Sequence, residues 1–466
     1  MGDENNDYLS FVEIIELVER FEESIQSGRA QFFDVHEFVA LIEFYIDHEA
    51  DDQALAALNQ AEAIYPSSIE IKYKRAEYYH MVGDDGKALA LVHEVEEVEK
   101  NNPDLHYLKG EILFDMGNLN AAIECFGKAI SVEPDDKIEL LYRISTFFLE
   151  NEEINLALKY LLLSYNKARG NLAVLFDLGY CFERLDELDK SVRYYNEYLD
   201  INPFSAAAWY NLGIVHTKLG EFEKAIECYD FCIAIDPHYS SAYHNKGNTL
   251  ATLERYAEAL KVFNELIELE PENPRVFALA GECYEKLEQY DMAIESYNRS
   301  ITIDPDFAEG YYGIGVVLAA RKKYDLSLNF IRRAITLNPE EYDFWLGLGR
   351  VYFEVNDLEN SLKAYREATS LNPDLPDAYL FLAEVLLYEE RFSEVEQLID
   401  GLGNKFDSNV SIKIINAAAL YLSHRSKEAL DILKDAKSID PSSIDDFINL
   451  VSPDADKEFI ENINKL

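Results

Sequence analysis

The chain has 466 residues, of which 42 are basic and 88 are acidic, so its formal net charge is -46. A protein with this charge repels nucleic acid, and its hydrophobic content of 48% is too high for an intrinsically disordered chain. The sequence shows no basic N-terminal segment followed by an apolar run and no apolar stretch approaching 18 residues. We therefore expect neither a secretory signal nor a membrane span.

The first predicted element is an amphipathic helix over residues 8–27. Its apolar side chains recur at helical spacing, and a Ser-x-x-Glu capping box precedes them. The apolar side consists of Phe11, Ile14, Val18, Phe21 and Ile25, and the capping box of Ser10 and Glu13. We expect residues 1–34 to form an N-terminal capping helix for the array that follows.

From residue 35 onward the sequence repeats with a period of 34 residues. The two tryptophans, Trp209 and Trp345, lie four such periods apart, and each opens a W-x2-L-G pattern that ends at a closing proline, Pro237 or Pro373. We expect Trp345 to fill a contact between two helices. Twelve repeats fit this frame, with Lys137 as one extra residue and first residues at 35, 69, 103, 138, 172, 206, 240, 274, 308, 342, 376 and 410.

Proline and glycine support the frame independently. Proline is tolerated at helix ends and in first turns, and twelve of the thirteen prolines open or close a repeat. A glycine in phase inside a helix indicates the close approach of a second helix, so each repeat is predicted to be a helical hairpin. The eighth position holds Gly110, Gly179, Gly213, Gly247, Gly281, Gly315 and Gly349, small residues recur at the twentieth position, and Gly83, Gly117 and Gly220 lie between the two helices.

Some repeats depart from the pattern. Repeats 2 and 3 place basic side chains where apolar ones recur elsewhere, and we expect their stems to cover the core while the charges stay in water. Repeat 4 lacks the glycine and the proline, which predicts a bend, and repeat 11 ends in Gly401 and Gly403, which predicts an irregular junction. The basic residues are Lys72, Arg75, His106 and Lys109.

After the last repeat, residues 444–466 are expected to form C-terminal capping helices. Pro453 opens a segment whose apolar side chains again follow helical spacing. These side chains are Phe459, Ile460, Ile463 and Leu466. The range 35–443 between the two caps therefore reads as one twelve-repeat array.

The W-x2-L-G-x2-Y pattern, the small residue at position 20 and the closing proline resemble the tetratricopeptide repeat. The resemblance implies an all-α fold, an α-solenoid that winds as a right-handed superhelix of stacked helix-turn-helix hairpins. It also implies a non-enzymatic scaffold or adaptor that binds a peptide, a disordered segment or a helix of a partner protein in its concave groove. The alternative is a regulatory or substrate-recruiting subunit of an enzyme complex.

In this family, positions 2, 5, 6, 9, 12 and 13 of each repeat point into the groove. Transferred to this chain, position 5 gives a row of aromatic residues that is interrupted at Ala278. Such rings suit peptide binding, although they equally suit packing between helices. The row consists of Tyr73, Tyr107, Tyr142, Phe176, Tyr210, His244 and Tyr312.

Charges divide the expected groove into two zones. In repeats 1 to 4 the other inward positions are mostly acidic, including Glu77, Asp104 and Glu111, with Arg143 as the main exception, and this zone should attract a basic segment. Repeats 6 and 7 present amides, which resemble a short form of the asparagine ladder of the O-linked N-acetylglucosamine transferase, although asparagine is also common in ordinary repeats. The amides are Asn211, Asn245 and Asn248.

No catalytic, cofactor-binding or metal-binding motif stands out. Cys228 and Cys232 lie one helical turn apart and near His216, but metal sites usually need three or four convergent ligands. Five cysteines, an odd number, fit reduced thiols in the cytoplasm. We expect a cytoplasmic, monomeric protein without cofactor or metal. Its partner is expected to be a protein or peptide with a basic segment, and neither nucleic acid nor membrane.

Overall fold

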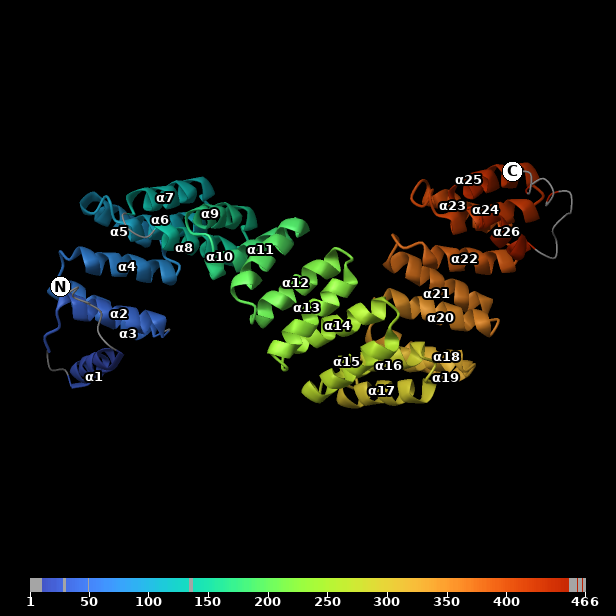
Figure 1. The fold of residues 1–466 in the computed structure, drawn as a ribbon, viewed down its shortest axis with the longest axis horizontal. Coiled ribbons are helices and arrows are strands. Elements are labelled where there is room, and N and C mark those ends of the chain that lie inside the picture. Colours follow the sequence, from blue (N-terminus) through green and yellow to red (C-terminus); the bar gives the residue numbers. More distant parts are fainter. Residues whose placement is uncertain are drawn as a thin grey trace. The chain divides into compact units, whose positions relative to one another are not determined.

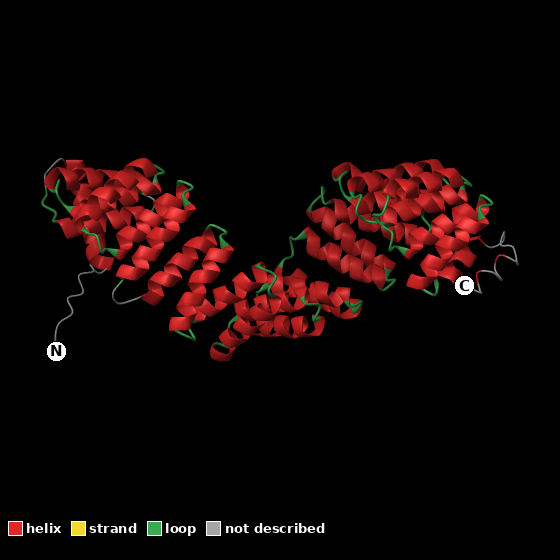
Figure 2. Cartoon of the chain, turned by 90° about the horizontal axis from the view of Figure 1, so that it is seen from above, coloured by secondary structure: helices red, strands yellow, loops and turns green. Residues whose placement is uncertain are grey.

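The structure, a computed structural model, describes residues 11–27, 31–48, 50–133 and 137–451, together with 459 and 463. The chain divides into two compact units, Met1–Phe204 and Ser205–Leu466, which we call unit 1 and unit 2. Within the described ranges all regular secondary structure is helical (Figures 1 and 2). The all-α fold predicted from the sequence is confirmed.

The described part of unit 1 contains eleven helices. They are α1 (Phe11–Ser27), α2 (Val35–Asp47), α3 (Asp51–Ile64), α4 (Ile69–Met81), α5 (Asp85–Val98), α6 (Pro103–Asp115), α7 (Leu119–Val132), α8 (Lys137–Glu150), α9 (Ile154–Lys167), α10 (Leu172–Arg184) and α11 (Leu188–Ile201).

The described part of unit 2 contains fifteen helices. They are α12 (Ala206–Lys218), α13 (Phe222–Ile235), α14 (Ser240–Thr252), α15 (Tyr256–Leu269), α16 (Pro274–Lys286), α17 (Tyr290–Ile303), α18 (Ala308–Ala320), α19 (Tyr324–Leu337), α20 (Tyr342–Glu354), α21 (Leu358–Leu371), α22 (Asp377–Tyr388), α23 (Phe392–Leu402), α24 (Val410–Leu422), α25 (Ser426–Ile439) and α26 (Ser443–Val451).

From α2 to α25 successive helices pair into hairpins, and the hairpins stack within each unit as an α-solenoid (Figure 1). The first helix of each hairpin begins at the expected repeat start, or one residue away from it for α8 and α22. Lys137 is the first residue of α8, which has 14 residues where α6 and α10 have 13. The bend expected at repeat 4 stays a prediction, because residues 134–136 lie outside the described residues.

The irregular end of repeat 11 is confirmed. Helix α23 has 11 residues, whereas the second helix of the next repeat, α25, has 14. It ends before Gly403, whose φ of 56° lies in the left-handed region that favours glycine. The early stop replaces the proline that closes most other repeats.

The glycine at position 8 allows a bulky side chain of the second helix to lie against the first. A Cβ atom on Gly247 would lie 2.4 Å from the ring of Phe263, which is closer than two carbon atoms can pack. At position 20, the hydroxyls of Ser191, Ser327 and Ser361 donate to the carbonyls of the glycines twelve residues earlier at 2.7, 2.7 and 2.8 Å. The close approach predicted from the small residues is confirmed.

The turn inside the hairpin carries a residue with positive φ at position 15 in repeats 2 to 12. The expected turn glycines Gly83, Gly117 and Gly220 have φ values of 78°, 79° and 73°. In eight other repeats a residue with a side chain takes the same conformation. These residues are Glu152, Asp186, Glu254, Glu288, Lys322, Asn356, Glu390 and His424.

The aromatic residue at position 4 ties its repeat to the end of the preceding one. The indole N–H of Trp345 donates to the carbonyl of Pro339 at 2.8 Å, and the hydroxyls of Tyr243 and Tyr311 donate to the carbonyls of Pro237 and Pro305 at 3.2 and 3.1 Å. In repeat 3, His106 Nε2 donates to the carbonyl of Lys100 at 2.9 Å. Trp345 is half-buried and packs against two clusters of buried residues from α19 to α22, so it makes the inter-helix contact that we expected and the hydrogen bond in addition.

The basic residues of repeats 2 and 3 are paired instead of being left to water. Arg75 is 6% exposed, and its Nε and Nη2 atoms lie 2.8 and 2.6 Å from the Glu62 carboxylate. Lys109 pairs with Glu96, and Lys72 Nζ lies 2.7 Å from Glu94. The expectation of a solvated charge is therefore wrong for Arg75, because a bidentate carboxylate satisfies the guanidinium inside the protein.

At the N-terminal end, the buried side chains of α1 are Leu17, Phe21 and Ser24, and the Phe21 ring lies 5.6 Å from that of Phe33. Ile25, which we placed on the apolar side, is 51% exposed. The predicted apolar side is therefore displaced toward Leu17 and Ser24. Ser10, and with it the capping box, lies outside the described residues.

At the C-terminal end, buried side chains of α26 pack onto α24, and Phe459 and Ile463 belong to the same core. The Phe459 ring lies 4.3 Å from that of Tyr421 in α24. Pro453, Ile460 and Leu466 lie outside the described residues. That the terminal segments act as caps stays a prediction.

Candidate functional site

In unit 1, a basic side chain lies among the expected tyrosine and carboxylates of α2 and α4. Lys74 Nζ lies 2.7 Å from both Glu43 and Glu77 and 5.4 Å from the centroid of the Tyr73 ring. Sequence reasoning missed Lys74, because it treated the inward positions of repeats 1 to 4 as acidic and named Arg143 as the main exception. The two carboxylates therefore share one cation of the protein itself.

Arg143, at position 6 of repeat 4, covers the neighbouring part of the surface. Its guanidinium carbon lies 3.7 Å from the centroid of the Tyr107 ring, and Nη1 lies 2.9 Å from Asp104 Oδ1. Tyr107 is 4% exposed, and its ring also packs 5.4 Å from that of Phe126. With Arg143 in place, the ring that we expected to contact a peptide has no open face.

Glu111 lies beside the same group. Burial raises its pKa from 4.5 to about 7, although a hydrogen bond with Tyr107 and the charges of Arg143 and His80 act in the opposite direction. Glu77 adds to the increase in pKa. Near neutral pH this carboxyl group is therefore only partly ionised, in contrast to the solvated carboxylate that we expected.

The aromatic row continues in unit 1 with Tyr142 and Phe176, both half-buried. Burial followed by the charge of Asp177 raises the pKa of Tyr142 to about 12, and the two side chains are hydrogen-bonded. The Phe176 ring lies 5.7 Å from those of Tyr195 and Tyr198. These contacts fit the packing role of the row at least as well as a binding role.

The amide zone lies at the start of unit 2, on α12 and α14. Asn245 Nδ2 donates to the Tyr210 hydroxyl at 3.2 Å, and Asn248 Nδ2 lies 3.1 Å from His244 Nδ1. Asn211 is half-buried on α12. Tyr210, His244 and Asn245 line a small cavity of about 190 Å³. Two of the three amides thus bond to the aromatic row beside them.

A larger hollow surrounds Tyr312 in repeats 8 to 10 of unit 2. It consists of two adjoining cavities of about 500 and 620 Å³ that share Glu285, Tyr312 and Val316. We call these two cavities together the Tyr312 hollow. Ala278, which we read as a break in the aromatic row, lines the first cavity, so the small side chain opens space there.

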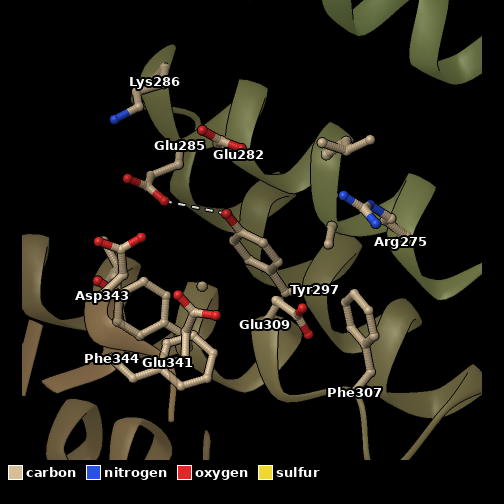
Figure 3. Close-up of a pocket in the computed structure, with 15 residues that line it drawn as sticks. Arg275, Glu282, Glu285, Lys286, Tyr297, Phe307, Glu309, Glu341, Asp343 and Phe344 are labelled. Atoms are coloured by element: carbon tan, nitrogen blue, oxygen red, sulfur yellow. Dashed lines mark hydrogen bonds between the residues drawn. The ribbon is translucent and has the colours of Figure 1, made fainter. Parts of the chain in front are cut away.

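Acidic side chains dominate the first cavity. In Figure 3, the carboxylates of Glu285 and Asp343 lie on one side of the opening and the guanidinium of Arg275 on the other. The Tyr297 hydroxyl donates to Glu285 Oε2 at 3.3 Å, and burial raises the pKa of Glu285. The acidic lining residues are Glu282, Glu285, Glu309, Glu341 and Asp343, and the basic ones are Arg275 and Lys286.

The carboxylates of the hollow are available to a partner. Glu282, Glu309 and Asp343 are exposed, and among the residues that the structure describes they form no ion pair. Aromatic rings complete the wall, where Tyr312 and Phe344 lie 4.8 Å apart. Carboxylates next to ring faces are the chemistry that binds ammonium and guanidinium groups.

Position 6 of the repeat allows aromatic rings to line this part of the surface. In unit 1 it holds Lys74 and Arg143, whereas in repeats 9 and 10 it holds Gly313 and Gly347. A Cβ atom on Gly347 would lie 2.7 Å from the hydroxyl of Tyr312, so the ring lies where a side chain would otherwise stand. This signal was present in the sequence, but we did not use it.

The thiol and histidine group around Cys228 does not assemble into a site. Cys228 and Cys232 are buried, which raises the pKa of each thiol to about 12, and His216 Nδ1 lies 2.7 Å from Glu221. Over the described ranges no His, Cys, Asp and Glu side chains form a group of three that could hold a metal ion. None of the described helices has the length and apolar character needed to cross a membrane.

A relative and two solved structures resemble parts of the chain. It is 30% identical over 156 residues to the TPR repeat-containing protein MJ1428 of Methanocaldococcus jannaschii, a match that spans 33% of this chain and only 21% of the relative. A tetratricopeptide repeat protein from Parabacteroides merdae matches 53% of this chain and 97% of its own, at 20% identity and a TM-score of 0.45. MamA from Desulfovibrio magneticus matches 37% of this chain and 99% of its own, at 21% identity and a TM-score of 0.35.

Family models match the chain in register with its hairpins. Tetratricopeptide repeat models match residues 103–136, 172–205, 206–239, 240–273 and 308–341, and a TPR repeat model matches 284–320 and 349–387. The first five matches begin at the first residues of α6, α10, α12, α14 and α18. Together the matches cover about half of the sequence, and the chain therefore belongs to the tetratricopeptide repeat family.

Proposed function

We propose that this protein is an interaction scaffold whose Tyr312 hollow binds an extended, lysine- or arginine-containing segment of a partner protein. Proteins of the tetratricopeptide repeat family are protein-interaction scaffolds and bind protein partners. The observation that carries the proposal is the set of exposed carboxylates without ion-pair partners around a hollow walled by aromatic rings. The five free, buried thiols suit a reducing compartment, and we propose the cytoplasm.

The charge of the hollow determines the proposed partner. The first cavity has five acidic and two basic lining residues, so a cationic segment gains attraction and an acidic one is repelled. The half-buried ring of Tyr312, which packs on the buried Phe344, offers apolar contact and cation–π attraction at close range. Arg350 in the second cavity would fix the direction of the segment by pairing with an acidic residue next to the cationic ones.

The proposal differs from the expectation that the acidic zone of repeats 1 to 4 recruits the basic segment. In unit 1 the carboxylates of Glu43, Glu77 and Asp104 are paired with Lys74 and Arg143, so they attract a further cation less strongly. The small cavity at Tyr210, His244 and Asn245 remains a proposed extension of the binding surface within unit 2.

The test uses peptides selected for binding to the full chain from a random library of 12-residue peptides. We expect them to carry net positive charge and to lose at least about tenfold in affinity for the triple variant Glu282→Gln, Glu309→Gln, Asp343→Asn, which removes three exposed carboxylates of the hollow. Fluorescence anisotropy of labelled peptides at two salt concentrations measures the loss and its electrostatic part.

A second triple variant serves as the matched control. Glu268→Gln, Glu295→Gln and Glu367→Gln change the net charge equally, and these residues are exposed on the second helices α15, α17 and α21. The control should change the affinity by less than about twofold. If both triple variants weaken binding equally, the peptides respond to overall charge and the hollow is not the site. Affinity purification with the two variants would then show whether a co-purifying partner is an enzyme, which would favour the alternative of a recruiting subunit.

A further inference from the structure

The environment of Arg143 in unit 1 has the composition of a binding site for an arginine side chain. Its guanidinium stacks 3.7 Å above the Tyr107 ring and pairs with Asp104 at 2.9 Å, next to the buried carboxyl group of Glu111. We propose that Tyr107, Asp104 and Glu111 form an arginine-binding site that Arg143 occupies, so that this surface is closed to partners until Arg143 leaves. This inference does not depend on the function proposed for the Tyr312 hollow.

The ligand class follows from the geometry of the present occupant. A separation of 3.7 Å between the guanidinium carbon and the ring centroid is that of a planar group lying over the ring face. Arginine can make this contact and still direct its N–H groups to a carboxylate, whereas an ammonium group acts as a point charge. Arg143 belongs to α8 and reaches back to α6, so it enters the site from a neighbouring repeat. A guanidinium from a partner would take the same place.

Arg143 can leave because its contacts are exposed. Its side chain is 48% exposed and that of Asp104 is 59% exposed, and ion pairs of this kind contribute little in water. Tyr107, in contrast, is buried and Glu111 is half-buried in α6, and both stay in place. The site therefore has a fixed part, formed by Tyr107 and Glu111, and a removable occupant, the Arg143 side chain.

The Arg143 side chain has a predictable effect on the affinity of the site for an arginine of a partner. If the closed arrangement is favoured over the open one about tenfold, an incoming arginine binds about tenfold more weakly than it would to the open site. Exposed cation–π and ion-pair contacts together have this magnitude. Removing Arg143 should restore the lost affinity.

The experiment measures binding of fluorescein-labelled tetra-arginine to the full chain. The background carries the triple substitution of the Tyr312 hollow, so that binding in unit 2 does not hide the effect. Arg143→Ala should raise the affinity about tenfold. The matched control Arg184→Ala removes an exposed arginine of the same unit, with the same change in charge, and should change the affinity less than about twofold.

A second variant locates the site of the increase. Adding Asp104→Asn to Arg143→Ala removes the exposed carboxylate without disturbing the buried Tyr107, and it should abolish most of the increase. Circular dichroism confirms that each variant is folded. The proposal is overturned if Arg143→Ala raises the affinity no more than Arg184→Ala does, or if the increase persists in the Asp104→Asn double variant.

Discussion

The two units use the same helix register but differ in the side chains at position 6 of the repeat and in the ion pairs around them. In unit 1, position 6 of the repeat holds Lys74 and Arg143, and these side chains pair with the carboxylates around them. In repeats 9 and 10 of unit 2, the same position holds Gly313 and Gly347, and the carboxylates nearby are left without ion-pair partners among the described residues. At position 6 the two surfaces therefore differ, with cations in repeats 2 and 4 and glycines covered by aromatic rings in repeats 9 and 10.

The comparison shows that acidic composition alone does not identify a binding surface in a protein of net charge -46. Both units are rich in carboxylates at the inward positions, yet in unit 1 several of them are neutralised from within. What distinguishes the Tyr312 hollow is that Glu282, Glu309 and Asp343 form no ion pair among the described residues, together with about 500 Å³ of open space in its first cavity. Exchanging position 6 between the units should exchange these properties.

The largest effect is expected for Gly347→Arg, which gives unit 2 the arrangement of unit 1. The new side chain must displace the Tyr312 hydroxyl and places a cation among the carboxylates. We expect the affinity for the selected cationic peptides to fall by about a hundredfold, or about 3 kcal/mol, measured by fluorescence anisotropy.

Gly401→Arg is the matched control, because it adds the same charge to unit 2 at a glycine with no atom within 4 Å of an added Cβ. It should leave the affinity within about twofold. If the two variants bind the peptides equally well, the residue at position 6 does not determine peptide binding at this surface. The comparison between the units then fails.

The next effect distinguishes a buried acid of unit 1 from the exposed acids of unit 2. Since burial raises the pKa of Glu111 from 4.5 to about 7, the folded protein keeps a proton there that the unfolded chain has already released. The stability due to this carboxyl group is therefore present below pH 4.5 and is lost as the pH rises through 7. Glu111→Gln cannot ionise. The difference in free energy of unfolding between this variant and the wild type should therefore shift by about 1–2 kcal/mol in favour of the variant between pH 5.5 and pH 8.

Chemical denaturation at the two pH values measures this difference. Glu124→Gln, at an exposed position of α7, is the control and should show the same small change at both pH values. If Glu111→Gln also shows no dependence on pH, the carboxyl group is ionised at neutral pH, and its burial does not separate the two units.

The smallest effect concerns a feature that the units share. Trp345→Phe keeps most of the ring but removes the hydrogen bond to the Pro339 carbonyl, so it should lower the free energy of unfolding by about 1 kcal/mol. His106→Phe should lower it by a similar amount in unit 1, where the ring bonds to the Lys100 carbonyl. Denaturation of both variants tests whether this contact stabilises the units equally. A stability equal to that of the wild type for either variant would show that the contact is not needed in that unit.

The fold was predictable because its signals recur in phase. Position 8 glycines, closing prolines and turn glycines each fix a backbone feature, and twelve repetitions average out local exceptions such as Lys137. The packing of Trp345 was predictable, but its hydrogen bond to the preceding repeat was not, because the direction of the indole N–H cannot be derived from the repeat pattern.

The residue types of the candidate site in unit 1 were predictable, but the presence of Arg143 in that site was not. The positions of Tyr107, Asp104 and Glu111 on α6 follow from helical spacing, but Arg143 reaches them from another repeat. Such contacts depend on the distance between neighbouring hairpins and on the rotamers of their side chains, which a period of 34 residues does not encode. The Tyr312 hollow was missed for a related reason, because small residues carry no chemistry of their own and show their effect only through what they leave open.

The turns inside the hairpins have a consequence for how the chain could change over evolutionary time. Eight of them hold a residue with a side chain in the left-handed conformation, which costs about 1 kcal/mol relative to an unstrained residue. Glycine there would remove that strain and lose part of the gain to the greater freedom of the unfolded chain, leaving a net increase of about 0.5 kcal/mol per turn. The protein therefore holds an unused reserve of stability in turns that, except for Lys322, do not line the Tyr312 hollow. This reserve could offset the cost of new side chains at position 6 as a surface adapts to a different partner.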